Sequence, residues 1–222
     1  MIQKKQNEKG VCIVKVLLIC GSPHKEGCTH TALNAVAEEL NKEGIETKEI
    51  WIGNKPVGGC TACGGCAGKG KCVYDDVVNE VLAQVEEYDG YIFGSPVYYA
   101  SPNGSMLAFM DRLFYAGASK MAYKPAAAVA SARRAGTTAT FDAMNKYFTI
   151  NNMPVVSSRY WNNVHGANGK GSDVLQDEEG LQIMRYLGRN MAWMLKCIEA
   201  GKNAGIHHPE PEASKINTNY IR

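Results

Sequence analysis

The sequence predicts an α/β fold: a doubly wound, five-stranded parallel sheet with helices on both faces. Three observations lead to this prediction. Short β-branched and aliphatic runs lack the alternation of half-exposed strands, which is typical of strands buried on both faces. Segments with a helical apolar repeat separate these runs, so strand and helix alternate five times. The 222 residues suit one domain (14–205), with an N-terminal extension (1–13) and a C-terminal arm (206–222).

The first strand is expected at 14–20, where "VKVLLIC" is apolar almost throughout. Thr29 then begins a helical pattern with one apolar face, and Gly44 ends it. Residues 47–52 alternate well enough for a second strand. After a cysteine-rich loop, two aspartates cap a helix whose apolar stripe reaches Val85.

The third strand is expected at 90–96, in "GYIFGSP", which ends in a turn. Ser101 is expected as the N-cap of the next helix, with Pro102 in its first turn. The apolar run 125–131 predicts a fourth strand, and 137–148 predicts the helix that follows it. The last two elements are a strand and a long amphipathic helix, expected at 153–160 and 181–198.

The charge of the chain does not favour nucleic acid as a partner. Lysine and arginine number 24 against 22 aspartates and glutamates, a net charge of +2, and no run of five like charges occurs. The apolar N-terminal run resembles a signal peptide, but Lys15 interrupts it and no small-residue cleavage site follows. No stretch is long and apolar enough to span a bilayer. We therefore expect a cytoplasmic protein without membrane association, whose thiols stay reduced.

Loops follow the expected strands at one edge of the sheet, where parallel α/β sheets bind ligands. The first, "GSPHKEGCT", opens a helix, and the N–H groups and positive end of a helix favour a phosphate. It contains neither a Walker GK pair nor GxGxxG, which points to a monophosphate such as that of FMN. The alternative is a polar turn that only caps the helix. The polar side chains available there are Ser22, His24, Lys25 and Thr29.

Two aromatic residues mark the loop after the third strand. The segment "GSPVYYASPNGSM" places Tyr98 and Tyr99 between two prolines at a strand end, where loops build binding sites. Tyrosine rings stack well on a flat ligand. Aromatic loop residues also often only cover a core, and that alternative stays open.

A cysteine-rich loop at 58–72, "GGCTACGGCAGKGKC", follows the second strand. Four thiolates spaced C-x2-C-x2-C-x5-C suit a 4Fe-4S cluster, and the glycines between them let the loop turn around it. A zinc site, a redox pair in the first Cys-x-x-Cys and reduced thiols without any metal are the alternatives. The candidate metal ligands are Cys60, Cys63, Cys66 and Cys72.

Three motifs carry a resemblance to a known family: "GSPHKEGCT", "GSPVYYASPNGSMLAFMDRLFY" and "RRAGTTATF...NMPVVSSRYWNNVHG". Over residues 14–200 the chain resembles the NAD(P)H-dependent FMN reductases of the flavodoxin-like superfamily. Its cysteine spacing resembles the iron–sulfur flavoproteins of the same superfamily. The resemblance implies a flavodoxin-like FMN-binding domain, NAD(P)H as co-substrate, and a homodimer or higher homo-oligomer.

The resemblance also implies which residues contact the cofactor. One group would hold the FMN phosphate, although the family usually has Asn at the position of Cys28. A second group would lie against the isoalloxazine ring, and a third would flank its other edge. The complete set is Ser22, His24, Cys28, Thr29, Pro96, Val97, Tyr98, Tyr99, Ser131, Arg133 and Gly136.

Three further side chains are candidates for a direct role in the reaction. Arg133 or Arg134 would stabilise the anionic reduced flavin electrostatically, and His165 would contact a substrate. The alternatives are that the adjacent arginines form solvated surface and that the histidine is structural.

The expected function is that of an FMN-dependent oxidoreductase. It would take hydride from NAD(P)H onto the flavin and pass electrons to a quinone, an azo or nitro compound, a flavin, a metal ion or a redox protein. Flavin chemistry needs no acid–base side chain, which agrees with the absence of a paired-carboxylate motif. Two alternatives remain: an electron carrier with a 4Fe-4S cluster, and a non-enzymatic flavin-binding redox sensor.

Overall fold

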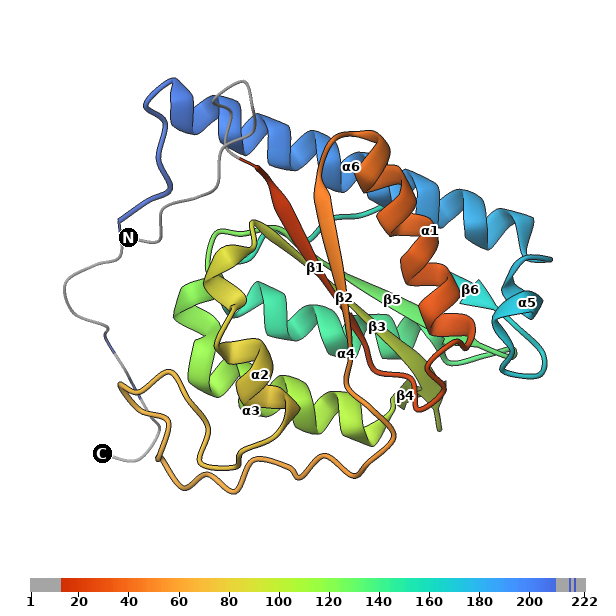
Figure 1. The fold of residues 1–222 in the computed structure, drawn as a ribbon, viewed down its shortest axis with the longest axis horizontal. Coiled ribbons are helices and arrows are strands. Elements are labelled where there is room, and N and C mark those ends of the chain that lie inside the picture. The colour runs from red at the N-terminus through yellow and green to blue at the C-terminus, as the bar shows by residue number, and fades with distance from the viewer. Residues whose placement is uncertain (1–12, 211–215, 217, 219–222) are drawn as a thin grey trace.

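The computed structural model describes residues 13–210, 216 and 218. Its centre is a sheet of five parallel strands in the order β2-β1-β3-β5-β6 (Figure 1), which confirms the predicted doubly wound sheet. A short strand, β4, pairs antiparallel with the end of β3. The strands are β1 (Lys15–Cys20), β2 (Glu46–Trp51), β3 (Gly90–Tyr98), β4 (Ser101–Pro102), β5 (Ala126–Ala132) and β6 (Asn163–His165).

Helices cover both faces of this sheet (Figure 1). One buried cluster joins one face to α1, α5 and α6, and a second cluster joins the other face to α2, α3 and α4. The helices are α1 (Cys28–Lys42), α2 (Val77–Leu82), α3 (Gly104–Met121), α4 (Thr137–Thr149), α5 (Gly171–Val174) and α6 (Glu178–Asn203), with a 3-10 turn, η1, at Val85–Glu87.

The first strand shows why the sequence pattern is continuous rather than alternating. Val16 and Leu18 belong to the cluster under α1 and α6, while Leu17 and Ile19 belong to the cluster under α2, α3 and α4. All four side chains are at most 1% exposed. Every position of the strand after Lys15 is therefore apolar, because both of its faces are covered.

The predicted fifth strand at 153–160 is wrong. In that segment the chain makes one isolated parallel bridge, between Val155 and Ala126, and the fifth strand of the sheet is β6 instead. Pro154 has no N–H to donate to a ladder, and residues 157–161 are exposed or half-buried. The apolar run is thus too short to cross the sheet, and the chain returns to β5 only at Asn163.

The start of α3 also differs from the prediction. Ser101 and Pro102 form β4, and the N-cap is Asn103, whose side chain accepts a hydrogen bond from the Met106 N–H at 2.7 Å. Asparagine is as good an N-cap as serine, so the sequence permitted both. The helix capped by Asp76 is shorter than expected, because Val85 lies in η1 and not in α2. The four-residue α5 had no counterpart in the prediction.

The two terminal segments fall mostly outside the structure. Residues 1–12 and most of the expected C-terminal arm lie outside the described residues, and 206–210 form neither helix nor strand. None of the helices in the described part of the chain combines the length and the apolar character needed to cross a membrane.

Candidate functional site

A cavity of about 190 Å³ opens at the carboxyl ends of β1, β3 and β5. We call it the edge cavity. Nine of the expected cofactor contacts line it: Ser22, His24, Cys28, Thr29, Pro96, Val97, Tyr98, Ser131 and Arg133. Four lining residues were not predicted, namely Ala132, Gly166, Ala167 and Gly169. They offer small or backbone groups, which carry no chemical signal in a sequence.

The loop from β1 to α1 forms one wall of the edge cavity. Ser22 Oγ accepts a hydrogen bond from the His24 N–H at 3.1 Å, and the indole N–H of Trp51 donates to the Ser22 carbonyl at 2.6 Å. The hydroxyls of Thr29 and Ser131 lie 2.8 Å apart and are buried, so they tie this loop to the end of β5. The N-cap of α1 is Gly27, which has no side chain to satisfy the first N–H groups of the helix. Those groups suit an anion such as a phosphate.

Cys28 contributes a neutral thiol to this wall. Burial, with a smaller contribution from Asp173, raises the pKa of the Cys28 thiol. Its Sγ donates to the Lys170 carbonyl at 3.3 Å. Because the thiol is engaged there, only backbone N–H groups at this position remain available to an anion.

Tyr98 and Tyr99 differ in position although they are neighbours. Tyr98 lines the edge cavity and is 47% exposed, whereas Tyr99 points fully into solvent and lies outside the lining. Tyr99 and Ala100 both have positive φ, 50° and 56°, an uncommon conformation for residues with a side chain.

Gly136 does not line the edge cavity either. Its φ is +90°, and a Cβ added there would lie 2.8 Å from both Ala100 Cα and Val97 Cγ1. Gly136 therefore allows the end of β3 and the turn after it, with Val97 and Ala100, to pack closely against the start of α4.

The three candidates for a direct role in the reaction are separated by the structure. Arg133 lines the edge cavity, and Arg134 does not. His165 contacts the loop that follows β5: its Nε2 bonds the Arg134 carbonyl at 3.1 Å, and its backbone N–H donates to Asp177 Oδ2 at 2.7 Å. These contacts give His165 a role in holding the loop.

A second cavity, of about 170 Å³, lies under the cysteine-rich loop, which runs beside α3 (Figure 1). We call it the cysteine cavity. The four candidate ligands all line it, and each is a free thiol. Among residues 13–210, 216 and 218, no three histidine, cysteine or acidic side chains are gathered closely enough to hold a metal ion. The complete lining is Cys60, Thr61, Ala62, Cys63, Gly64, Cys66, Cys72, Val73, Tyr74, Arg112 and Tyr115.

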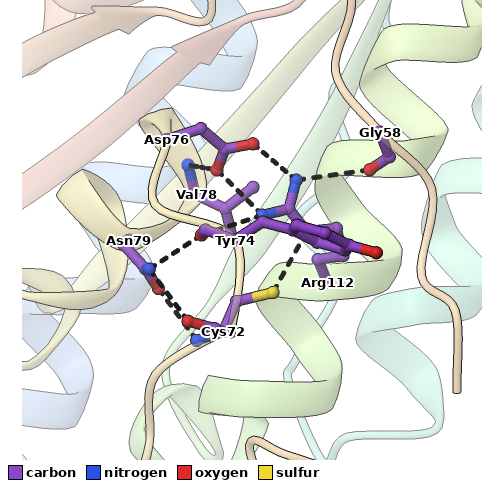
Figure 2. Close-up of polar contacts among 7 residues, drawn as sticks. All are labelled: Gly58, Cys72, Tyr74, Asp76, Val78, Asn79 and Arg112. Atoms are coloured by element: carbon purple, nitrogen blue, oxygen red, sulfur yellow. Dashed lines mark hydrogen bonds and ion pairs between the residues drawn. The ribbon is translucent and has the colours of Figure 1, made fainter. Parts of the chain in front are cut away.

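A buried arginine lines the cysteine cavity, and Figure 2 shows its polar contacts. The side chain of Arg112, on α3, is 1% exposed. Its Nε–H donates to Cys72 Sγ at 3.2 Å, and its two terminal nitrogens bond Asp76 at 2.6 and 2.9 Å. The same nitrogens donate to the carbonyls of Gly58 and Tyr74, each at 3.2 Å.

These donors change the chemistry of Cys72. Burial acts to raise the pKa of its thiol, but hydrogen bonds from the Tyr74 backbone and from Arg112 lower it by more, so the pKa lies below its ordinary value. Asn79 fixes the backbone of the same residue: its side chain accepts from the Cys72 N–H at 2.8 Å and donates to the Cys72 carbonyl at 3.0 Å (Figure 2).

In residue type and in placement around one cavity the donor set fits an iron–sulfur cluster, although the four thiols do not stand at metal-binding distance from one another. Four thiols face one cavity on a loop without helix or strand, and Ala62, Gly64, Gly68 and Gly70 have the positive φ that tight wrapping needs. A buried N–H donor to one sulfur is the outer hydrogen bonding that such clusters use.

Comparison with known proteins assigns the chain to a family. Residues 14–168 match the family described as NADPH-dependent FMN reductase. The chain belongs to this family. An iron–sulfur flavoprotein of Methanocaldococcus jannaschii is 35% identical over 196 residues, which are 84% of this chain and 100% of the relative. The resemblance stated from the sequence is thus confirmed.

Solved structures support the fold of this FMN reductase family member. RosB, with bound 8-demethyl-8-formylriboflavin-5'-phosphate, has a TM-score of 0.67 at 14% identity, over 94% of this chain and 93% of RosB. A flavodoxin from the domain Archaea has a TM-score of 0.56 at 16% identity, over 82% of this chain and 99% of the flavodoxin. The fold is therefore flavodoxin-like.

Arg112 and Asn79 are the residues of this site that sequence reasoning missed. Asp76 was expected only as a helix cap, a role it does fill by accepting from the Val78 N–H. The available signal was Arg112 itself, which with Asp111 is one of two charged residues inside the otherwise apolar run from Met106 to Phe114.

Proposed function

We propose that this flavin oxidoreductase transfers electrons between FMN in the edge cavity and a 4Fe-4S cluster in the cysteine cavity. The observation that carries the proposal is that all four cysteines of the loop line a single cavity, with a buried arginine donating to one sulfur. The names of the relatives, iron–sulfur flavoproteins, agree with it. Both proposed cofactor sites belong to one domain, residues 14–205.

In this proposal FMN is held by the nine expected residues that line the edge cavity. The N–H groups at the start of α1 bind its phosphate, and Ser22 and Thr29 shape the loop around it. Tyr98 supplies an aromatic face, and Arg133, which also lines the cavity, supplies positive charge. FMN, when bound, supplies both hydride and single-electron chemistry.

The cluster would be held by Cys60, Cys63, Cys66 and Cys72, and it would supply single-electron transfer. Arg112 offers Cys72 a hydrogen-bond donor and a positive charge, and both favour the thiolate that a metal requires. The thiols need a reducing compartment to stay free for a metal, so the proposal includes a cytoplasmic location.

Anaerobic purification tests the proposal directly. We expect roughly one FMN and about four irons and four sulfides per chain. Cys66→Ser is expected to lose most of the iron and sulfide while keeping FMN. Cys197→Ser, which removes an exposed free thiol on α6, serves as the matched control and should keep all three. Protein with FMN but without iron and sulfide would reject the cluster.

A second candidate function is the one that the family description names, NADPH-dependent FMN reduction. Tyr98 leaves one wall of the edge cavity partly open to solvent, which gives a nicotinamide room to approach. Mixing anaerobic protein with NADH or NADPH should bleach the flavin absorbance within seconds if this is the function. Acceptors to try are quinones, azo and nitro compounds, free flavin and ferric ions. If neither reduced nucleotide bleaches the flavin, the electron carrier or a flavin-binding sensor is favoured.

We also propose a homodimer or larger homo-oligomer. Large apolar side chains are exposed near the edge cavity and on neighbouring elements, including Tyr99, Tyr160 and Trp161. Light scattering on the eluted protein measures the mass against the 24.2 kDa of one chain, and a monomeric mass at all concentrations would contradict this part of the proposal.

A further inference from the structure

Arg112 lies under the cysteine-rich loop, and every N–H of its guanidinium group makes a hydrogen bond there. Its five N–H bonds are directed to five acceptors, namely Cys72 Sγ, the two Asp76 oxygens, and the carbonyls of Gly58 and Tyr74 (Figure 2). This is the full donor capacity of the group. Its orientation is therefore fixed from every side.

These acceptors come from both ends of the cysteine-rich loop. Gly58 begins the loop and Cys72 ends it, and one side chain on α3 bonds both. Burying a guanidinium is unfavourable unless it is paired and hydrogen-bonded, and here it is both, with a cysteine sulfur of the cavity among its partners. A buried arginine at this point therefore suggests a role in the chemistry of the cysteine cavity.

The four cysteines are held very unequally. Cys72 has Arg112 on its sulfur and Asn79 on both sides of its backbone. Cys60 and Cys63 are exposed, and the Cys66 sulfur makes a long contact of 3.8 Å to the Tyr115 carbonyl, while the Cys66 carbonyl accepts from the Lys69 N–H at 3.0 Å. Cys72 is thus fixed in place before any metal binds.

We propose that Arg112 is the positioning residue of the cysteine cavity, and that with Asp76 it sets the reduction potential of the bound cluster. This inference rests on the proposed function. An N–H bond to a ligand sulfur stabilises the more negative, reduced cluster and so raises its potential. Asp76 opposes this effect, because its carboxylate lies beside the same guanidinium.

Removing the charge of Arg112 and removing the charge of Asp76 should shift the cluster potential in opposite directions. Arg112→Gln removes the positive charge and the Nε–H donor, so the cluster potential should fall. Asp76→Asn removes the negative charge but keeps an N-cap of equal quality for α2, so the potential should rise. For each variant we expect the ratio of reduced to oxidised cluster at a fixed applied potential to change about tenfold. For a one-electron couple this corresponds to a shift of about 59 mV.

Controls separate positioning from a merely structural role. Arg159→Gln removes an exposed arginine whose guanidinium lies over Tyr186 and should leave the potential unchanged. Asn79→Ala loosens Cys72 without changing charge, so it should lower iron content and leave the potential of the remaining cluster unchanged. Arg112→Lys keeps the charge and loses the planar fork; its potential should lie between those of wild type and Arg112→Gln. Circular dichroism melts establish that each variant is folded.

The experiment is an anaerobic redox titration followed by electron paramagnetic resonance, with iron and sulfide measured on the same samples. Shifts of opposite sign for Arg112→Gln and Asp76→Asn support the inference. Equal potentials, or shifts of the same sign, overturn it while the proposed function stands. If Arg112→Gln does not fold, Asp76→Asn and Arg112→Lys decide the matter by the same criterion. A wild type without iron and sulfide overturns the inference together with the cluster.

Discussion

Cys28 and Cys72 are chemically different thiols, although each lines a cavity. Cys28 is 8% exposed and its sulfur donates to a carbonyl, so burial keeps the pKa of its thiol raised. Cys72 receives a hydrogen bond from Arg112, and the pKa of its thiol is lowered. The edge cavity thus contains a neutral sulfur, and the cysteine cavity contains one that ionises readily.

This contrast predicts an order of alkylation in metal-free protein. Because a thiolate reacts and a thiol does not, Cys72 should reach half of its maximal iodoacetamide labelling at a lower pH than Cys28. Peptide mass spectrometry over a pH series measures both midpoints in one sample. In urea the two midpoints should converge, since both shifts arise from the fold. A lower midpoint for Cys28 in the native protein would contradict the assignment.

For single residues, the sequence predicted which side chains have a chemical role better than it predicted which side chains meet in space. Residue types that carry a signal, such as Ser22 and the four loop cysteines, line the cavities where the pattern placed them. Arg112 was missed because its importance lies in the acceptors around it, and those come from segments up to 54 positions away. Spacing along a chain does not show which side chains meet in this way.

At the scale of elements, Asn103 connects α3 to the first strand. Its side chain accepts from the Met106 N–H and donates to the Gly21 carbonyl, and its own N–H donates to Ser95 Oγ. It is 4% exposed. A single residue therefore caps a helix and joins the loop that follows β1 to the strand β3.

Asn103→Ala should lower the free energy of unfolding by about 1–3 kcal/mol, since it removes an N-cap and leaves a buried carbonyl unpaired. Urea unfolding followed by circular dichroism gives the value. Asn34→Ala on α1 is the control, because that amide is exposed and bonds only Glu38, so the loss should be below about 0.5 kcal/mol. Similar losses in the two variants would disprove a special role for Asn103.

Gly136 couples a helix start to the wall of the edge cavity. In Gly136→Ala the new Cβ would overlap the backbone of Ala100, so the end of β3 with Val97 and Tyr98 must move. We expect FMN to bind about tenfold more weakly, or ~1.4 kcal/mol, measured by titrating apoprotein and following the quenching of flavin fluorescence.

Gly44→Ala is the matched control for that substitution. Gly44 also has a positive φ, +78°, but a Cβ there meets open space. It shares the backbone strain and lacks the clash, so it should reduce stability and leave FMN affinity intact. Equal affinity losses in both variants would mean that strain, and not the position of the loop, controls binding.

The elements that were predicted correctly are those with a long, uniform apolar pattern. Four of the five central strands and the principal helices lie where buried runs and helical repeats placed them. The fifth strand was misplaced because β6 has only three residues, "NVH", of which only Val164 is buried. A strand that short is recognised by its pairing with β5, which no local pattern contains.

Across the whole molecule, burial on both faces of the sheet makes the fold sensitive to alkali. Burial raises the pKa of Cys20, at the end of β1, from about 9 to about 12. The pKa of Tyr91 on β3 is also raised, first by burial and then by nearby acidic groups. Both groups hold their protons more tightly in the folded state than in the unfolded state.

Stability should therefore fall as pH rises from 9 towards 12. In that window the unfolded chain binds fewer protons than the folded one, so the free energy of unfolding declines with pH. For Cys20 alone the slope is about 1.4 kcal/mol per pH unit. Urea midpoints measured from pH 7 to 11 test this, and Cys20→Ala should show a shallower decline above pH 9. An identical decline in that variant would assign the effect to tyrosines.

Arg112 bonds both ends of the cysteine-rich loop, and this affects how freely the length of the loop can change. Since Gly58 and Cys72 are joined at their base, the residues between them form a closed ring that is separate from the sheet. Doubling the length of a flexible ring costs only about 0.6 kcal/mol in closure entropy. The spacing between cysteines can thus be shortened, lengthened or exchanged as a module, while the flavodoxin-like domain beneath it keeps its packing.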